Sequence, residues 1–383
     1  MPVVSRRIVE EERQTRRKLP IDGPFLLILF AIIITGLIAL FTASYPDALY
    51  DPDIDSPAFY VIRQGGFALA GVGMMFIISK IDYHILHKWQ IPVFVLAILL
   101  LAVTPFIGVT RNEATRWIEV GGVSFQTSEL MKTAVILSFS SFATIYQKKM
   151  RTFRYGVLPY ILVLGVIALL LSRQPHLSAT IIIGMTGVSI LFVAGIKIWY
   201  IIPVVAVAVP SMYWYVQHNE YAMTRFRVWL DPFIDYLNKG WQACQSFIAI
   251  GSGGLWGLGL GQGRQKHLYL PEPANDFVFS AWCEEMGFIG AVLVMIMFAY
   301  LIYRGLYIAR NAKDRFGCLL AVGIISKIAI QTLVNLFVVS GIMPVTGAAL
   351  PFFSYGGTAL LLQLMEIGVL LNISRQTKLG RLE

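Results

Sequence analysis

Apolar residues run along this chain in long blocks that short polar segments separate. A stretch of about 20 apolar residues can cross the hydrocarbon core of a bilayer as a helix. The pattern therefore predicts an all-α polytopic membrane helix bundle of about ten transmembrane helices. The ten blocks lie near residues 23–43, 60–78, 91–108, 127–145, 155–171, 177–194, 198–215, 286–309, 317–340 and 354–372. Prolines punctuate the fifth to seventh blocks, so nine helices remain an alternative.

Basic residues gather in alternate short segments between the blocks, as in Lys148, Lys149, Arg151 and Arg154. Because Lys and Arg favour the cytoplasmic side, both termini are expected inside the cell, which agrees with an even number of helices. The first block lacks a following small-residue cleavage site and is expected to be an uncleaved signal anchor. The predicted organisation is one membrane domain over residues 23–373, with cytoplasmic tails at residues 1–22 and 374–383.

Residues 216–285 form the only long connection, and in this topology the connection faces outward. A connection of this length in a compact chain is usually functional. Aromatic residues are spread through it, at Phe226, Trp229, Phe233, Trp241 and Phe247. We therefore expect short amphipathic helices at the membrane surface within this loop.

The composition supports a membrane protein and excludes several other classes. Only 14% of the residues are charged and the mean hydropathy is +0.68, whereas soluble domains average about 25% charged residues. The net charge of +9 is explained by basic residues that orient helices, so no nucleic acid partner is expected. Cys244, Cys283 and Cys318 form no CxxC motif or Cys/His cluster, so the sequence indicates no zinc site.

Ionisable residues inside the apolar blocks are candidates for function, because burying a charge in a membrane is costly. Glu129 and Lys132 lie three residues apart near the start of the fourth block, so they share a helix face and can pair. Such a pair either locks helix packing or lines a polar cavity. Lys327, Gln331 and Asn335 repeat at helical spacing in the ninth block and could face the same cavity.

The end of the long loop carries glycines, cations and an acid. Gly-rich backbone from residue 251 to 263 can approach a ligand closely, and Arg264 and Lys266 are suited to phosphate oxygens. Asp276 precedes the eighth block and could act as a general base. The alternative is a flexible loop with a solvated basic pair and a helix-capping Asp. The last outward loop, residues 341–358, is rich in proline and glycine. Irregular backbone at membrane depth has to be shielded from lipid by protein or by a cavity. The alternative is a re-entrant turn with only a structural role.

These segments together resemble the SEDS family of cell-wall proteins, which includes FtsW, RodA and SpoVE. The matching runs are Arg116–Ile118, Ser128–Lys132, Gly251–Gly254, Leu270–Phe277 and Pro344–Gly357, in the order that the family has them. The run Arg264–Glu272 and the ending Leu371–Arg375 are closer to the division and sporulation branch than to the elongation branch.

The resemblance implies an inverting peptidoglycan glycosyltransferase that polymerises lipid II at the outer face of the bacterial cytoplasmic membrane. It implies that Asp276 is the essential aspartate and that Glu129 and Lys132 are the family's functional pair of one acidic and one basic residue. It also makes Glu272, Ser354 and Tyr355 candidates for binding the substrate. The implied partners are a class B penicillin-binding protein, which is a transpeptidase, and other division or elongation proteins.

The expected chemistry agrees with these residue types. The donor leaves as a pyrophosphate, which is already a good leaving group, so one base is enough and no general acid is needed, unlike in two-carboxylate glycosidases. Cations should neutralise the pyrophosphate, a role open to Arg116, Lys132, Arg264 or Lys266. No cofactor is expected beyond a divalent cation, which the sequence neither requires nor excludes.

The chain departs from the family pattern at one position. His176 follows Gln174 and Pro175 where the family commonly has an aspartate. A tolerated substitution at a helix start is one interpretation, and a pH-sensitive variant is the other.

Two other functions remain open from the sequence. A lipid II flippase would use the same intramembrane polar residues as a path, although a transporter would place its acids nearer the midplane. A non-catalytic scaffold for a transpeptidase would tolerate replacement of Asp276.

Overall fold

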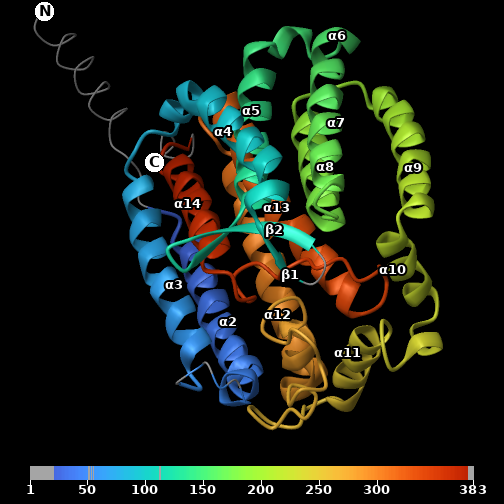
Figure 1. Ribbon diagram of the computed structural model, residues 1–383. Coiled ribbons are helices and arrows are strands. Elements are labelled where there is room, and N and C mark those ends of the chain that lie inside the picture. Colours follow the sequence, from blue (N-terminus) through green and yellow to red (C-terminus); the bar gives the residue numbers. More distant parts are fainter. Residues whose placement is uncertain (1–20, 51, 53, 55, 112–113, 378–383) are drawn as a thin grey trace, which may run out of the picture.

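The computed structural model describes residues 21–50, 52, 54, 56–111 and 114–377. Most of the two predicted cytoplasmic tails, residues 1–20 and 378–383, therefore lies outside the described residues. Within the described chain, a helix occupies each of the ten predicted apolar blocks. Figure 1 shows these helices as a bundle with α9 standing at its edge. They are α2 (Gly23–Tyr50), α3 (Phe59–Ile78), α4 (Leu86–Ile107), α5 (Thr127–Ile145), α7 (Leu158–Ser172), α8 (Leu177–Val193), α9 (Ile201–His218), α12 (Val278–Arg310), α13 (Arg315–Val339) and α14 (Gly357–Ser374).

Seven helical segments among the described residues are long and apolar enough to cross a membrane. They are α2, α3, Tyr83–Ile107, Phe153–Ser172, α12, α13 and α14, and α8 is a shorter apolar helix. The segment Tyr83–Ile107 joins the short helix η1 (Tyr83–Ile85) to α4, and Phe153–Ser172 joins α6 (Phe153–Gly156) to α7. The chain is thus a helical integral membrane protein, while the number of ten crossings stays a prediction.

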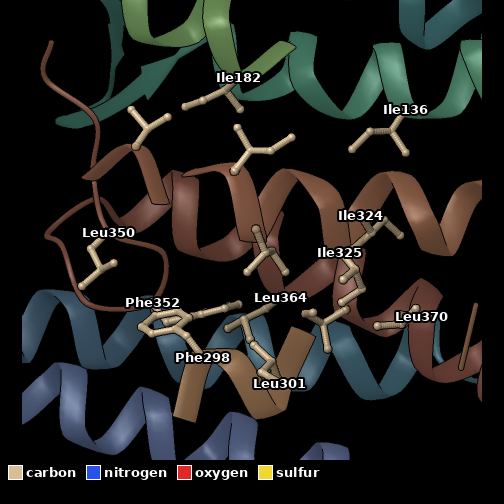
Figure 2. Packing of buried hydrophobic residues seen from close by; sticks show 14 of the residues in the cluster. Ile136, Ile182, Phe298, Leu301, Ile324, Ile325, Leu350, Phe352, Leu364 and Leu370 are labelled. Carbon is tan, nitrogen blue, oxygen red and sulfur yellow. The ribbon is translucent and has the colours of Figure 1, made fainter. Parts of the chain in front are cut away.

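Helix α13 lies at the centre of the bundle and contacts α5, α8, α12 and α14. In its apolar window 78% of the residues are buried, whereas the corresponding figure for the α4 segment is 17%. Figure 2 shows the packing around α13, with Ile136 and Ile182 on one side and Leu301 and Leu364 on the other. Because lipid tails are as apolar as these side chains, close packing rather than loss of water holds the helices together.

Glycine permits several close contacts between these helices. A Cβ atom on Gly71 of α3 would lie 2.6 Å from Leu364 of α14, and one on Gly323 of α13 would lie 2.7 Å from Ile136 of α5. Small residues at helix crossings let neighbouring backbones approach, as is common in membrane proteins. These positions thus fix how near α13 and α14 come to their neighbours.

A small antiparallel sheet, which was not predicted from the sequence, precedes α5. Its strands are β1 (Val109–Arg111), β2 (Ala114–Val120) and β3 (Val123–Gln126), in the order β1-β2-β3. Gly121 and Gly122, which join β2 to β3, both have positive φ, as a two-residue hairpin turn requires. The sheet carries Arg116 on β2 and leads directly into α5.

The long loop contains the short helices that the sequence predicted, α10 (Glu220–Leu230), η4 (Pro232–Asp235) and α11 (Trp241–Ser252). Their location at the membrane surface stays a prediction. The glycine-rich segment after α11 packs against a break in α12 at Gly287, where φ is 63° and ψ is −165°. There Phe288 N donates to Gly254 O at 2.8 Å, and Leu258 N donates to Glu284 O at 3.0 Å. Helix α12 begins at Val278, eight residues before the predicted start of the eighth apolar block at residue 286, because the break at Gly287 joins an additional helical segment to it.

Candidate active site

A cavity of about 1610 Å³ opens where the sheet, the start of α5, α10, α11 and the segment 341–358 meet. It brings together residues that lie far apart in the sequence. Of the predicted site residues, those lining it are Arg116, Glu129, Lys132, Glu272, Asp276, Ser354 and Tyr355. The cavity combines acids, cations and apolar walls, as expected for a substrate with charged and apolar parts.

Asp276 lies in the wall of this cavity, just before α12 begins at Val278. The pKa of its carboxyl group is raised from 3.8 to about 6, chiefly by burial and secondly by the negative charge of Glu272. The positive charges of Arg225 and Arg116 oppose this rise. A carboxylate with a pKa near 6 is a stronger base than an ordinary Asp and is still ionised at neutral pH.

Two arginines from separate elements accompany this carboxylate. Arg116 on β2 is 8% exposed, and its Nε donates to Gln174 O at 3.3 Å. Arg225 on α10 donates from Nη1 to Val345 O at 2.5 Å. Arg116 was predicted from the sequence, whereas Arg225 was not, because its only signal is a position on a short helix of the long loop.

Gly347 brings the last outward loop against Asp276. A Cβ atom on Gly347 would lie 3.2 Å from Asp276 Oδ2 and 3.5 Å from Arg116 Nη1. The φ of Gly347 is also positive, at 74°, which side-chain-bearing residues rarely adopt. Glycine at this position thus allows the loop to close on the carboxylate and the guanidinium.

Glu129 and Lys132 lie at the start of α5, where both line the cavity. Lys132 Nζ lies 2.6 Å from Glu129 Oε1 and also donates to Gln331 Oε1 on α13 at 3.0 Å. The pairing that the sequence predicted is confirmed, and Gln331 of the predicted polar stripe also lines the cavity. Behind this pair, Lys327 of α13 forms a buried ion pair with Glu366 of α14.

Hydrogen bonds connect Ser354 and Tyr355 to neighbouring segments of the cavity wall. The Ser354 hydroxyl accepts a hydrogen bond from Leu350 N at 2.7 Å, which closes the turn over residues 350–354. Tyr355 N donates to Ala274 O at 2.9 Å, which joins this turn to the segment that carries Asp276. Whether Glu272, Ser354 and Tyr355 contact the substrate stays a prediction.

Arg264 and Lys266 are not brought to the cavity. The Arg264 residue is exposed on the glycine-rich segment, and its backbone N donates to Glu284 Oε1 at 2.9 Å. Lys266 is 2% exposed and pairs with Glu285 Oε1 at 2.6 Å. In this arrangement the Lys266 ammonium group secures the loop to the broken helix α12, and the geometry gives no support to pyrophosphate binding by either residue.

His176 is buried directly before α8, within a hydrogen-bonding network. Its Nε2 lies 2.8 Å from Gln126 Nε2, and its Nδ1 lies 3.2 Å from Ser178 Oγ. Burial, and then the nearby charges of Arg116 and Lys132, hold the pKa of His176 well below its usual range. A neutral imidazole at physiological pH favours the tolerated substitution over the pH-sensitive variant.

The three cysteines form no disulfide in the described part of the chain. Within the described residues, no group of three or more His, Cys, Asp or Glu side chains could hold a metal ion.

Known proteins are similar to this chain over nearly its whole length. The sequence model of the FtsW, RodA and SpoVE family, described as cell cycle protein, matches residues 24–379. Stage V sporulation protein E of Bacillus subtilis (strain 168) is 40% identical over 95% of this chain and 100% of its own. A probable peptidoglycan glycosyltransferase FtsW of Geobacter sp. (strain M18) is 38% identical over 92% of this chain and 97% of its own.

Solved structures have the same fold. A chain of a peptidoglycan synthase complex that coordinates polymerization and crosslinking superposes with a TM-score of 0.77 at 26% identity, over 94% of this chain and 99% of that chain. The rod shape determining protein RodA of Thermus thermophilus superposes with a TM-score of 0.64 at 24% identity, over 94% of this chain and 98% of its own.

Proposed function

The chain belongs to the FtsW, RodA and SpoVE family of cell cycle proteins, and we propose that it is a peptidoglycan glycosyltransferase that polymerises lipid II. The FtsW relatives carry that enzyme name, and the related synthase complex couples polymerization to crosslinking. The observation that carries the proposal is the Asp276 carboxylate in the cavity wall, with a raised pKa and with Arg116 and Arg225 beside it.

In the proposed reaction, Asp276 takes the proton of the acceptor's 4-hydroxyl group as that oxygen attacks the anomeric carbon of the donor. The new glycosidic C–O bond forms as the bond from the anomeric carbon to the pyrophosphate oxygen breaks, with inversion at that carbon. The leaving undecaprenyl pyrophosphate takes the electron pair, so no general acid is needed. This direct displacement requires one base and nearby cations.

Arg116 and Arg225 are suited to hold the pyrophosphate. Planar guanidinium groups donate several hydrogen bonds to phosphate oxygens and keep their charge at every physiological pH. Both side chains line the cavity from elements that flank the Asp276 segment. Cations fixed before the reaction stabilise the charge that develops on the leaving group.

Glu129 and Lys132 form the polar floor of the same cavity. Lys132 is held by Glu129 and Gln331, so its ammonium group has a fixed position. We assign this pair to binding the polar part of the substrate, and the outer cavity wall with Asp276 to the chemical step. We further propose that the chemical step takes place at the outer face of the cytoplasmic membrane, with both termini inside the cell.

The test is glycan polymerisation from labelled lipid II by the purified protein, with and without a class B penicillin-binding protein. Asp276→Asn keeps the size of the side chain but cannot take a proton, and we expect it to fold and to make no glycan. Asp235→Asn is the matched control, because Asp235 lies in the same long loop but does not line the cavity. Equal product from Asp276→Asn and wild type would remove Asp276 from the role of base.

One observation favours a second candidate function, a lipid II flippase. The ion pair Lys327–Glu366 lies inside the bundle behind Glu129 and Lys132, so ionisable groups continue beyond the cavity floor. Lipid II transfer between leaflets of proteoliposomes that is abolished by Lys327→Met, together with no glycan from wild type, would support transport instead of polymerisation.

A further inference from the structure

Asn335 of α13 bonds to the segment that carries Asp276, and the proposed reaction does not use it. Its side chain is 0% exposed. The Nδ2 group donates to Asp276 O at 2.8 Å and to Ala348 O at 2.7 Å. One buried amide group thus ties the segment before α12 to the last outward loop, beside Gly347.

The next residue of the same helical stripe makes a parallel connection. Gln331, one turn earlier on α13, donates from Nε2 to Ala349 O at 3.0 Å and accepts from Lys132 Nζ at 3.0 Å. Two successive carbonyl groups of the last outward loop are therefore bonded to the central helix of the bundle. The bonds of Asn335 and Gln331 link this loop to Asp276 on one side and to Lys132 on the other.

We propose that Asn335 is a positioning residue that holds the Asp276 carboxylate against Gly347 and Arg116 in the geometry needed for proton transfer. The proposal deepens the proposed function, because it rests on Asp276 as the base. Asn335 contacts the backbone of Asp276 and not the carboxyl group, so it acts through Asp276 and touches no reacting atom.

The physical reason is that the Asp276 carbonyl lies just outside α12. The first helical carbonyl, Phe277 O, accepts from Ser280 N and Ala281 N, so the regular bonds of α12 begin one residue after Asp276. A catalytic group needs a placement accurate to a fraction of an ångström, and a shift of about 1 Å can lower the rate about 100-fold. The amide of Asn335 supplies this fixation from the most buried helix.

The test compares wild type with Asn335→Leu, in which the side chain keeps a similar size but loses both donors. We expect kcat for glycan polymerisation to fall on the order of 100-fold, with the KM for lipid II changed much less. The Asp276 carboxyl group, no longer held in place, should gain water, so the acid limb of the pH profile should move to lower pH. The charged groups that face it, Arg116, Arg225 and Glu272, are unchanged in this variant.

A second measurement is independent of activity. The carboxyl stretch of Asp276 can be titrated by infrared difference spectroscopy, with Asp276→Asn to identify its band. We expect its midpoint in Asn335→Leu to lie below that of wild type. An unchanged midpoint and an unchanged kcat in the folded variant would overturn the proposal. Failure of the proposed function is distinguishable, because then wild type would make no glycan while the spectroscopic shift would still test the positioning.

Asn372 on α14 is the matched control, because it is a second buried asparagine that holds two backbone segments. Its Nδ2 donates to Ser79 O at 2.8 Å and its Oδ1 accepts from Tyr83 N at 3.0 Å, away from the cavity. We expect Asn372→Leu to lower the stability of the protein without moving the acid limb or the Asp276 midpoint. An equal shift in both variants would mean that Asn335 acts only through general stability.

Discussion

The ion pair between Lys327 and Glu366 allows a quantitative test of the bundle interior. Their side chains are 1% and 4% exposed, and Glu366 Oε1 also accepts a hydrogen bond from Thr133 Oγ1 at 2.6 Å. Lys327→Met would leave the Glu366 carboxylate buried with the Thr133 hydroxyl as its remaining bond among those described. Breaking a buried pair by removing one partner costs about 3–5 kcal/mol, so we expect the free energy of unfolding to fall by about that amount.

The double variant Lys327→Met, Glu366→Leu should behave differently from the sum of its parts. Replacing both members of a buried ion pair by apolar residues of similar volume is often neutral or stabilising by about 1–4 kcal/mol. We therefore expect the double variant to regain most of the stability that Lys327→Met loses. The difference defines a coupling energy on the order of 3 kcal/mol, at the upper end of values for contacting residues.

The four proteins of the cycle are wild type, Lys327→Met, Glu366→Leu and the double variant. Their reversible unfolding is measured in mixed micelles with increasing dodecyl sulfate, and it is followed by tryptophan fluorescence and circular dichroism. Lys88→Met is the control for removing a positive charge, because Lys88 is exposed on α4 and its replacement should change stability by less than about 0.5 kcal/mol. The reasoning is refuted if Lys327→Met costs no more than Lys88→Met, or if the double variant is as unstable as the sum of the single variants.

Three further predictions concern the cavity. Because the proposed base must be deprotonated and the pKa of Asp276 is about 6, kcat/KM should fall as the pH drops through about 6. Glu272→Gln removes a neighbouring negative charge, so it should move this acid limb of the pH profile to lower pH. An acid limb at the same pH in wild type and Glu272→Gln would argue against Asp276. Arg225→Ala should raise the KM for lipid II about 10-fold or more, since charged hydrogen bonds contribute about 1.5–3 kcal/mol, while Arg173→Ala, at an exposed arginine outside the cavity, should leave the KM unchanged. Gly347→Ala should lower kcat in a protein that still folds. The positive φ at this position costs about 1–2 kcal/mol in an L residue, and the alanine Cβ would lie 3.2 Å from Asp276 Oδ2. Normal glycan synthesis by this variant would contradict the close approach of residue 347 to Asp276.

The positions of the helices could be predicted because the membrane imposes a simple requirement on the sequence. Every spanning segment must be apolar and satisfy its own backbone hydrogen bonds, so length and hydropathy locate the helices within a few residues. The sheet before α5 has no such requirement. The only sign of this sheet in the sequence is the pair Gly121 and Gly122, which joins two short segments that pair as strands. Such a pair is a short-range indication of a hairpin and is much weaker than a long apolar block.

The break in α12 was missed for a related reason. Gly287 lies in an otherwise continuous apolar helix, and a single glycine is tolerated in such helices without a break. What forces the break is the segment after α11, whose backbone bonds to residues on both sides of Gly287. That contact joins distant parts of the chain and leaves no local trace in the sequence.

The sequence predicted several residues that line the cavity. It could not predict the role of a residue whose partner comes from another part of the fold. Lys266 has the charge and the neighbourhood of a phosphate-binding residue, yet its ammonium group pairs with the carboxylate of Glu285 on α12, 19 residues further along the chain. Arg225 had no such neighbourhood but is brought beside Asp276 by the packing of α10 against the last outward loop. The type of a residue suggests which chemistry it could perform. Whether the residue is free for that chemistry depends on the oppositely charged group that the fold places beside it.

The spacing of polar residues in α13 predicts which of them share a helix face, but it does not predict their hydrogen-bond partners. Spacing of four residues places Lys327, Gln331 and Asn335 on one face, and a buried face must find hydrogen-bond partners. The spacing cannot say that the partners differ in kind: a carboxylate for Lys327, an ammonium group and a carbonyl for Gln331, and two carbonyls for Asn335. Those carbonyls belong to irregular loops, which have no period of their own. A helix at the centre of the bundle can therefore supply a rigid support for the proposed base, and the sequence indicates the helix face but not the groups that the helix holds.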